Sequence, residues 1–378
     1  MLRTFSFSLL VLMIALGGFG PTRADVVLGS WNIRTLATNG TVFPDDVPRT
    51  DADFALLRTA RDRLGADVIA LQEVTSPHAV AKVFPASDYV ICFSGQYDAD
   101  EAGLAPWYPP EKLGGIKPTC YGDANAPFPD PTAGAPRKQY VAVVVRRASG
   151  MVVESVRDVP ELGLTVEEEN RDTKQMEIRS VRWGLEATLA GDRKRFRLLA
   201  VHLKSGCNTG ELREVNWNNP TTWSPNGRND HACMTLARQM APLRSWLARA
   251  RADAVPFVIA GDMNRRIDIE AADEQTPDFW PVLTGAATPR ADDDQPLARV
   301  PEGEKSKKAC WPEDDKSVFV NAIDYFIFDA QFRPADWGAS YTKLRYADMV
   351  DPVTSKKLTK KDDAGRTSDH CPFSVRLK

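Results

Sequence analysis

The sequence V-P-F-V-I-A-G-D-M-N, residues 255–264, joins an apolar, β-branched run to a turn and two polar side chains. The apolar run predicts a buried strand, and Gly261 allows the backbone to turn where that strand ends. Asp262 and Asn264 are two residues apart, so their side chains point to the same side of an extended chain. The pair suits binding of a hydrated cation and a charged oxygen. Taken alone, it is explained at least as well by an Asx turn.

Other apolar runs predict further strands, and many of them also end in polar residues. Helical spacing of apolar residues predicts helices at 51–64 and 230–251, and a short helix is expected near Trp280. Many strands with few helices between them predict an α/β layered sandwich. The predicted strands are residues 26–33, 66–74, 88–94, 139–146, 151–158, 179–189, the start of 196–207, 255–260, 318–328 and a last one after His370.

The polar residues at these strand ends form the candidate site. A single polar residue at a strand end would not indicate a site, since a lone histidine is more often structural than catalytic. A whole set following Val-, Ile-, Leu- and Ala-rich runs is hard to explain as solvated surface, and strand ends on one sheet edge are where α/β proteins bind ligands. The candidate residues are Asn32, Glu73, His202, Asp262, Asn264, Asp324, Asp369 and His370.

The N-terminus has the three parts of a secretory signal. Arg3 precedes the apolar residues 5–16, and Thr22-Arg23-Ala24 provides a cleavage site. The apolar run is shorter than the ~20 residues that a membrane span requires. We therefore expect cleavage after Ala24, a secreted or periplasmic protein, and a single domain over residues 25–378, because no repeat or change in composition marks a second one.

Charge and cysteine content narrow the class of protein. The 48 basic and 51 acidic residues give a net charge of -3, which excludes a basic protein that coats nucleic acid. An even number of cysteines in an exported chain favours disulfides, and the absence of a C-x-x-C pair argues against a zinc site. Local pairing would close off three long irregular segments and predicts the bonds Cys92–Cys120, Cys207–Cys233 and Cys310–Cys371.

Six short motifs together resemble one family. They span residues 30–372 in the order S-W-N-I, L-Q-E-V, V-H-L-K-S, G-D-M-N, A-I-D-Y-F and S-D-H-C-P. Their order is similar to that in the endonuclease/exonuclease/phosphatase superfamily, also called DNase I-like. The resemblance implies a four-layer α/β sandwich of two mostly antiparallel β-sheets flanked by helices. It also implies hydrolysis of a phosphoester with a divalent metal, usually Mg²⁺, with Mn²⁺ or Ca²⁺ as alternatives.

The resemblance also implies a metal site and a general base. Glu73 matches the metal-binding glutamate of the family, and Asn32 and Asp369 complete or flank that site. A hard dication takes oxygen ligands and keeps several waters, so few protein ligands are needed. His370 matches the general base that activates water, and Asp324 matches the carboxylate that fixes its tautomer.

Three further residues match positions that contact the substrate. Asp262 and Asn264 correspond to the pair that orients the nucleophile and holds the phosphate oxygens. His202 corresponds to a second histidine that contacts the phosphate or assists the leaving group. A histidine at this position resembles the DNase I, sphingomyelinase and phosphatase branches, whereas the abasic-site endonuclease branch usually has tyrosine there.

The sequence therefore predicts an exported, metal-dependent phosphodiesterase, with a DNase I-like nuclease as the first hypothesis and nucleic acid as the substrate. A sphingomyelin or phospholipid phosphodiesterase, or a hydrolase of small phosphoesters, is the alternative. A catalytically silent binding module is a third hypothesis, which the complete polar set argues against. Trp217 and Trp223 could contact bases or lipid, or pack within their own loop. No stable protein partner is predicted.

Overall fold

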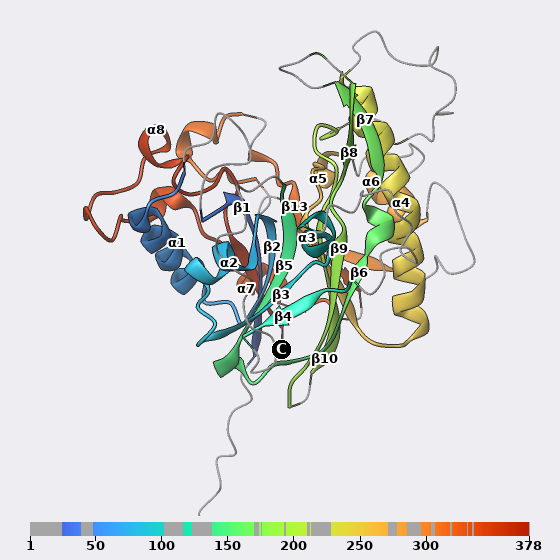
Figure 1. The fold of residues 1–378 in the computed structure, drawn as a ribbon, viewed down its shortest axis with the longest axis horizontal. Helices are drawn as coiled ribbons and strands as arrows, with labels where there is room; N and C mark the ends of the chain where they lie inside the picture. The colour runs from blue at the N-terminus through green and yellow to red at the C-terminus, as the bar shows by residue number, and fades with distance from the viewer. Residues whose placement is uncertain are drawn as a thin grey trace, which may run out of the picture.

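A computed structural model shows two β-sheets packed face to face, with helices on both outer sides (Figure 1). This arrangement confirms the predicted α/β sandwich. The N-terminal segment 1–24, Trp217 and Trp223 lie outside the residues that the structure describes. Those residues are 25–38, 48–101, 116–122, 138–169, 174, 176–192, 194–209, 212, 228–270, 278–285, 296–303, 307–317, 320–330, 332–334 and 336–377.

The first sheet has seven strands in the order β14-β15-β1-β2-β5-β3-β4. Its only parallel pair is β1 with β2, and all other neighbours are antiparallel. The helix α1 (Asp51–Leu64) connects the parallel pair, as a parallel connection requires. The strands are β1 (Val26–Leu36), β2 (Val68–Val74), β3 (Tyr89–Phe93), β4 (Thr119–Tyr121), β5 (Tyr140–Arg146), β14 (Thr342–Lys343) and β15 (Phe373–Leu377).

The second sheet has six strands in the order β12-β13-β11-β10-β9-β6. It repeats the same plan, with one parallel pair, β10 with β11, connected by the long helix α4 (Arg228–Ala252). The strands β7 (Thr165–Glu169) and β8 (Met176–Ser180) form a separate two-stranded ribbon. The strands of the second sheet are β6 (Val152–Val159), β9 (Gly184–Ala190), β10 (Arg195–His202), β11 (Phe257–Asp262), β12 (Leu297–Val300) and β13 (Asp324–Asp329).

Helices cover the outer faces of both sheets. On the first sheet, Phe54 and Leu57 of α1 belong to the same buried cluster as Trp31 of β1. On the second sheet, Trp246 of α4 packs edge-on against Phe257 of β11. The remaining helices are α2 (Pro77–Val83), α3 (Gln96–Glu101), α5 (Ile267–Glu270), α6 (Phe279–Thr284), α7 (Trp337–Ser340) and α8 (Lys360–Asp363).

The inner faces of the two sheets form a third buried cluster. It contains Leu28, Ala70, Ala200, Ala260 and Phe326, which come from five different strands. Because strand side chains alternate, the residue two positions away on each strand faces the same inter-sheet space. Toward one end of the sheets these residues are polar: Ser30 and then Asn32 in β1, Gln72 in β2, His202 in β10, Asp262 in β11 and, two positions before Phe326 in the antiparallel β13, Asp324.

The predicted helix 51–64 is confirmed with the same bounds. Thr50 accepts a hydrogen bond from the Asp53 amide, and the Asp53 carboxylate accepts from the Thr50 amide, which forms a complete capping box. Gly65 ends the helix with a left-handed φ of 61°. The predicted helix 230–251 and the short helix near Trp280 are also present, as α4 and α6.

Two predicted strands differ from the structure. The continuous strand 179–189 is divided, because the buried Gln96 side chain hydrogen-bonds the Val181 carbonyl and the Trp183 amide and so takes the place of a neighbouring strand. The strand predicted at 318–328 begins only at Asp324, where pairing with β11 starts. Both segments are apolar, as the prediction of a buried strand requires. An apolar composition does not show, however, where the neighbouring strand ends.

The three predicted disulfides are present: Cys92–Cys120, Cys207–Cys233 and Cys310–Cys371. The first joins the adjacent strands β3 and β4, and the third joins Cys371, directly after His370, to a segment before β13. Within the described part of the chain, no helix has the length and apolarity needed to cross a membrane.

Gly261 has no room for a side chain, so we expect its replacement to destabilise the folded protein. A Cβ atom there would lie 2.1 Å from the Val201 carbonyl oxygen and 3.0 Å from the Gln72 amide nitrogen, at a φ of +142°. We expect Gly261→Ala to lower the free energy of unfolding by about 3 kcal/mol, as overpacking and backbone strain do elsewhere. Urea unfolding measures this change. Gly338→Ala is the control, because a methyl group at Gly338 meets no described atom within 4 Å.

Candidate functional site

The polar strand ends of both sheets meet around one cavity of about 390 Å³. β1 and β2 supply residues from the first sheet, and β10 and β11 supply residues from the second. The segments before β5, β9 and β15 and those after β10 and β11 supply the rest. Side-chain alternation in the inter-sheet layer explains why residues far apart in sequence converge here. The lining residues are Arg34, Thr35, Glu73, Gln139, Arg182, His202, Ser205, Asp262, Asn264, Asp369 and His370.

Asn32 links the two sheets. Its side-chain nitrogen donates to the Asp262 carboxylate of the second sheet at 3.1 Å and to the Glu73 carboxylate of the first sheet at 3.0 Å. Its side-chain oxygen accepts from the Arg34 amide at 3.1 Å. Asn32 is 1% exposed, so these bonds satisfy a buried amide and fix the two carboxylates relative to each other.

Glu73 reaches the cavity because the backbone of β2 is irregular at this residue. Its φ is 58°, and the pairing register shifts between Gln72 and Val74. A regular strand would direct Glu73 to the face opposite Gln72. The irregularity instead lets its carboxylate accept from the Thr35 amide at 3.2 Å and from Gln139 at 2.5 Å.

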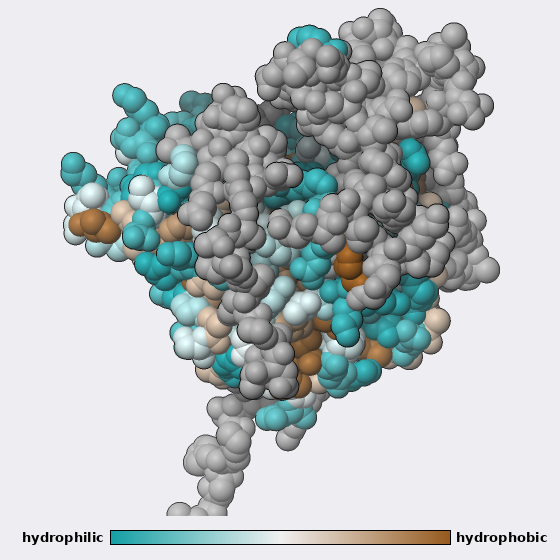
Figure 2. Space-filling view, viewed as in Figure 1, coloured by the Kyte–Doolittle hydropathy of each residue, from teal (hydrophilic) through white to brown (hydrophobic). Residues whose placement is uncertain are grey.

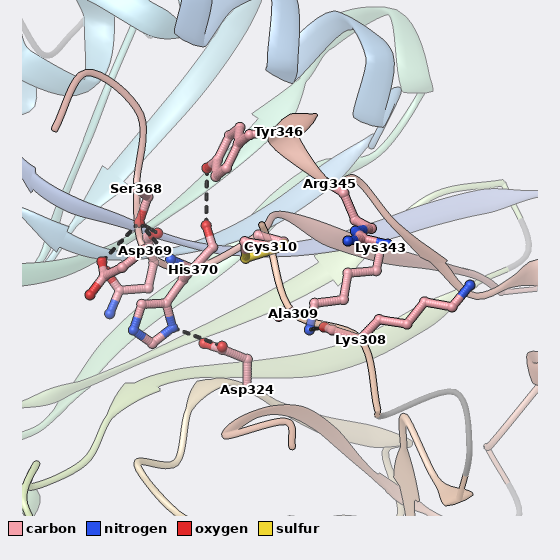
Figure 3. Close-up of a disulfide and its surroundings, with 12 residues drawn as sticks. Lys308, Ala309, Cys310, Asp324, Lys343, Arg345, Tyr346, Ser368, Asp369 and His370 are labelled. Carbon is pink, nitrogen blue, oxygen red and sulfur yellow. Dashed lines mark hydrogen bonds and ion pairs between the residues drawn. A yellow bond between two sulfur atoms is a disulfide. The ribbon is translucent and has the colours of Figure 1, made fainter. Parts of the chain in front are cut away.

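His370 and Asp324 form a close pair (Figure 3). The His370 Nδ1 atom lies 2.8 Å from an Asp324 carboxylate oxygen, and Nε2 lies 3.7 Å from the Asp262 carboxylate. Burial alone lowers the pKa of His370, but Asp324 and Asp262 outweigh it and raise that pKa well above its usual value. In the neutral form of His370, Nδ1–H is donated to Asp324 and Nε2 can accept a proton, which is the arrangement of an oriented general base.

The main chain around His370 is held from both sides. The Tyr346 hydroxyl donates to the His370 carbonyl at 3.0 Å and accepts from Trp31 Nε1 at 2.9 Å. The Ser368 hydroxyl donates to the Asn32 carbonyl at 2.8 Å. These bonds tie the segment that carries Asp369 and His370 directly to β1. Figure 3 shows the bond between Tyr346 and the His370 carbonyl.

His202 is a second, differently tuned histidine. Its Nε2 lies 3.6 Å from the Asp262 carboxylate and 3.7 Å from that of Glu73. Burial lowers the pKa of His202 well below its usual value, and Arg182 and His370 act in the same direction. Burial also raises the pKa of Asp262 to about 7, with Asp324 and Glu73 adding to that rise. A neutral imidazole can donate a hydrogen bond to an anionic ligand, and so can the Asp262 carboxyl group when it is protonated.

Asn264 occupies the turn after β11. It has a left-handed φ of 51°, and its amide donates to the Asp262 carboxylate at 2.7 Å. Its side-chain nitrogen donates to the Leu203 carbonyl at 3.0 Å, which ties the ends of β10 and β11 together. The Asx turn is therefore real, and its two polar residues also line the cavity. The two interpretations of this sequence are compatible.

The donor set fits a hard divalent cation. Glu73 and Asp369 present carboxylates to the same cavity, and hard dications select such oxygen ligands. Burial raises the pKa of Asp262, and the neighbouring carboxylates of Asp324 and Glu73 raise it further, so a cation beside them would relieve part of this repulsion. Asn32 supports the site by orienting Glu73, since its oxygen is directed to the Arg34 amide. The oxygen and nitrogen atoms of Asp262, Asp324 and His370 also lie within 4.8 Å of one another, but the His370–Asp324 hydrogen bond already uses two of these groups.

Several residues that line the cavity were not predicted from the sequence. Gln139 donates to Thr35 at 2.9 Å and to Glu73, and accepts from Arg182 at 2.6 Å, so it connects a carboxylate to a cation. Gln139 precedes β5, whose start lies at the same sheet edge as the end of the antiparallel β2. Polar residues before antiparallel strands could therefore have indicated it, whereas Arg182 has no comparable signal.

Comparison with known proteins identifies the chain's family. Residues 29–370 match the model of the Endonuclease/Exonuclease/phosphatase family, and a search of curated proteins finds no match. Among solved structures, the chain is similar to an endonuclease/exonuclease/phosphatase from Bacteroides vulgatus (12% identity, 94% of this chain and 99% of that chain, TM-score 0.46). It is also similar to the human Nocturnin catalytic domain with bound sulfate (12%, 94% and 94%, 0.43). A third is D. rerio TDP2 complexed with a single-strand DNA product (14%, 94% and 99%, 0.41).

If the cavity carboxylates bind a divalent cation, removing one of them should lower the affinity for the metal. We expect Glu73→Gln to weaken Mn²⁺ binding by at least about tenfold, because it removes a charged oxygen ligand while keeping the size of the side chain. Isothermal titration calorimetry on the folded protein measures the affinity. Glu154→Gln, at a glutamate that pairs with Arg195 on the surface, is the control and should bind Mn²⁺ as the unmodified chain does. Equal affinities for both variants would exclude Glu73 as a ligand.

Proposed function

Because this chain belongs to the Endonuclease/Exonuclease/phosphatase family, whose members hydrolyse phosphoester bonds, we propose that it is a divalent-metal-dependent phosphodiesterase and that DNA is its substrate. The observation that carries the proposal is the His370–Asp324 pair at 2.8 Å beside the carboxylates of Asp262, Glu73 and Asp369 in one cavity. An oriented base beside a cation-binding carboxylate set is what hydrolysis of an anionic ester requires.

Each site residue has its own role in the proposed reaction. His370 Nε2 takes a proton from the attacking water, and Asp324 holds the Nδ1–H and stabilises the imidazolium that forms. Asp262, 3.7 Å from Nε2, helps to orient that water. His202 and Asn264 hold the phosphoryl oxygens from the second sheet. A bound divalent cation, held by Glu73 and Asp369, supplies positive charge for the phosphoryl oxygens.

Nucleic acid is favoured by the charge of the cavity wall. Arg34 of β1 and Arg182, in the segment before β9, both line the cavity, so it combines two cationic groups with its acidic centre. A polymeric substrate carries phosphates on both sides of the one that is cleaved, and arginine is well suited to bind them. The near-neutral overall charge is compatible with release of the product.

A lipid phosphodiester is the second candidate, and one observation favours it. Val350 and Val353 are 51% and 63% exposed, and both lie in the loop before Leu358. Two lysines of this loop, Lys356 and Lys357, are also exposed, as at a surface that contacts anionic lipid. Figure 2 shows apolar residues only in small separate groups on the described part of one face, which is less than a lipid-binding surface usually presents.

Hydrolysis of two substrates side by side tests the function. We expect residues 25–378, with disulfides formed, to nick supercoiled plasmid DNA in the presence of Mg²⁺ and to leave sphingomyelin liposomes intact. A chelator should abolish the nicking. Glu73→Gln and His370→Ala should each lower kcat by at least about a hundredfold, as loss of a metal ligand or general base does. Release of choline phosphate with intact DNA would instead select the lipid, and unchanged activity in both variants would exclude the mechanism.

We also propose that the protein is exported and that residues 1–24 are removed. The three disulfides support this, because such bonds persist in oxidising compartments. Expression of the full chain in a Gram-negative host should yield a product that begins at Asp25, as measured by intact mass. Replacing the apolar residues Leu9 and Leu10 with arginine should leave an unprocessed chain in the cytoplasm. An uncleaved chain in both cases would contradict the proposal.

A further inference from the structure

Arg49 donates hydrogen bonds to the main-chain carbonyl groups of five described residues. Its Nη1 donates to Thr35 at 2.9 Å, and its Nη2 to Ile33 at 3.0 Å and Arg34 at 2.8 Å. Nη2 also donates to Thr367 at 2.6 Å, and Nε to Arg366 at 3.4 Å. One half-buried guanidinium group therefore joins two chain segments that are more than 300 residues apart in sequence.

Each of these two segments is adjacent to site residues. Residues 33–35 directly follow Asn32, and residues 366–367 directly precede Ser368, Asp369 and His370. The site therefore depends on how these two segments lie relative to each other. Arg49 itself precedes Thr50, the N-cap of α1, so the rigid helix end holds the guanidinium group in place.

The local backbone shows why a cation is needed at this position. Arg34 and Thr35 have left-handed φ values of 42° and 47°, a backbone conformation that is strained for residues other than glycine. Their carbonyls and that of Ile33 all accept from the same guanidinium group. A planar, charged fork with five N–H groups can bind several carbonyls from two segments at once.

Arg366 reinforces the same junction from the other direction. Its guanidinium group bonds Asp53 of α1 at 2.5 Å and also pairs with Asp351 and Asp363. Two arginines therefore connect the start of α1 to the segment before Asp369. They differ in their partners: Arg366 binds carboxylates, whereas Arg49 binds the main chain next to the site residues themselves.

We infer that Arg49 is a positioning residue that sets the distance between the Asn32–Glu73 side of the cavity and the Asp369–His370 side. Arg49 lies outside the cavity lining and acts through the two main-chain segments that it joins. Its effect on catalysis rests on the proposed function. Its effect on the geometry of the two segments does not.

Replacement and chemical rescue test this inference. We expect Arg49→Ala to lower kcat for plasmid nicking by about 10–100-fold with a change in KM below about threefold, because His202 and Asn264, which hold the phosphoryl oxygens, belong to neither of the two segments. Arg49→Lys should recover only part of the activity, since one ammonium group cannot reach both segments. Millimolar guanidinium chloride should restore Arg49→Ala, but it should not restore His370→Ala.

Arg63→Ala is the matched control. Arg63 lies at the other end of α1 and donates to a single carbonyl, that of Asp348, at 2.8 Å. This variant should keep the kcat of the unmodified chain and should not respond to guanidinium. Loss of activity in Arg49→Ala without rescue, together with a fall in Tm that matches the loss, would overturn the inference by showing a merely structural role.

Hydrogen–deuterium exchange separates this inference from the proposed function. In Arg49→Ala, exchange should rise in residues 26–38 and 364–373 and stay unchanged in α4, and guanidinium should reverse the rise. If the unmodified chain hydrolyses neither DNA nor lipid, the proposed function fails while this exchange result still decides the role of Arg49. Unchanged exchange in both segments would overturn the inference whatever the activity.

Discussion

The packing of two β-sheets against each other determines where every polar group of the site lies. Side chains alternate along each strand, so one set fills the space between the sheets and the other meets the helices outside. The inner set is apolar until the strands reach one edge, where it becomes polar in β1, β2, β10, β11 and β13. The Asn32–Asp262 hydrogen bond at 3.1 Å joins the two sheets at this transition. The site is therefore the polar end of the core.

Such a site concentrates buried charge, and the surrounding structure balances it. Asp262 is 1% exposed and has close acidic neighbours, which is why its pKa rises to about 7. Hydrogen bonds from Asn32, Gln139 and the Thr35 amide neutralise part of the charge of Glu73. Asp324 and Asp262 raise the pKa of His370, whereas burial and Arg182 lower that of His202. Two histidines in one cavity thus acquire different roles from their surroundings.

The main chain at the edge of the site is irregular, and the irregular backbone directs side chains and carbonyl groups toward the site. Glu73, Asn264 and the pair Arg34 and Thr35 all have positive φ values. Each deviation directs a side chain or a carbonyl to a position that a regular strand could not reach. The Cys310–Cys371 disulfide and Tyr346 hold the segment that carries His370, and Arg49 joins this segment to the strained pair Arg34 and Thr35.

The sequence by itself determined the alternation of apolar residues, the capped helix 51–64, the local pairing of the cysteines and the polar residue at each strand end. These are properties of neighbours in the chain, and six ordered motifs made the family resemblance specific. Only the tertiary structure decided that Gln96 interrupts the strand predicted at 179–189, that Gln139 connects Glu73 to Arg182, and that Arg49 joins the two segments beside the site. The physical reason is that each of these depends on which distant main-chain or side-chain groups lie within about 3 Å, and hydrogen bonds of this length form only after both sheets have packed.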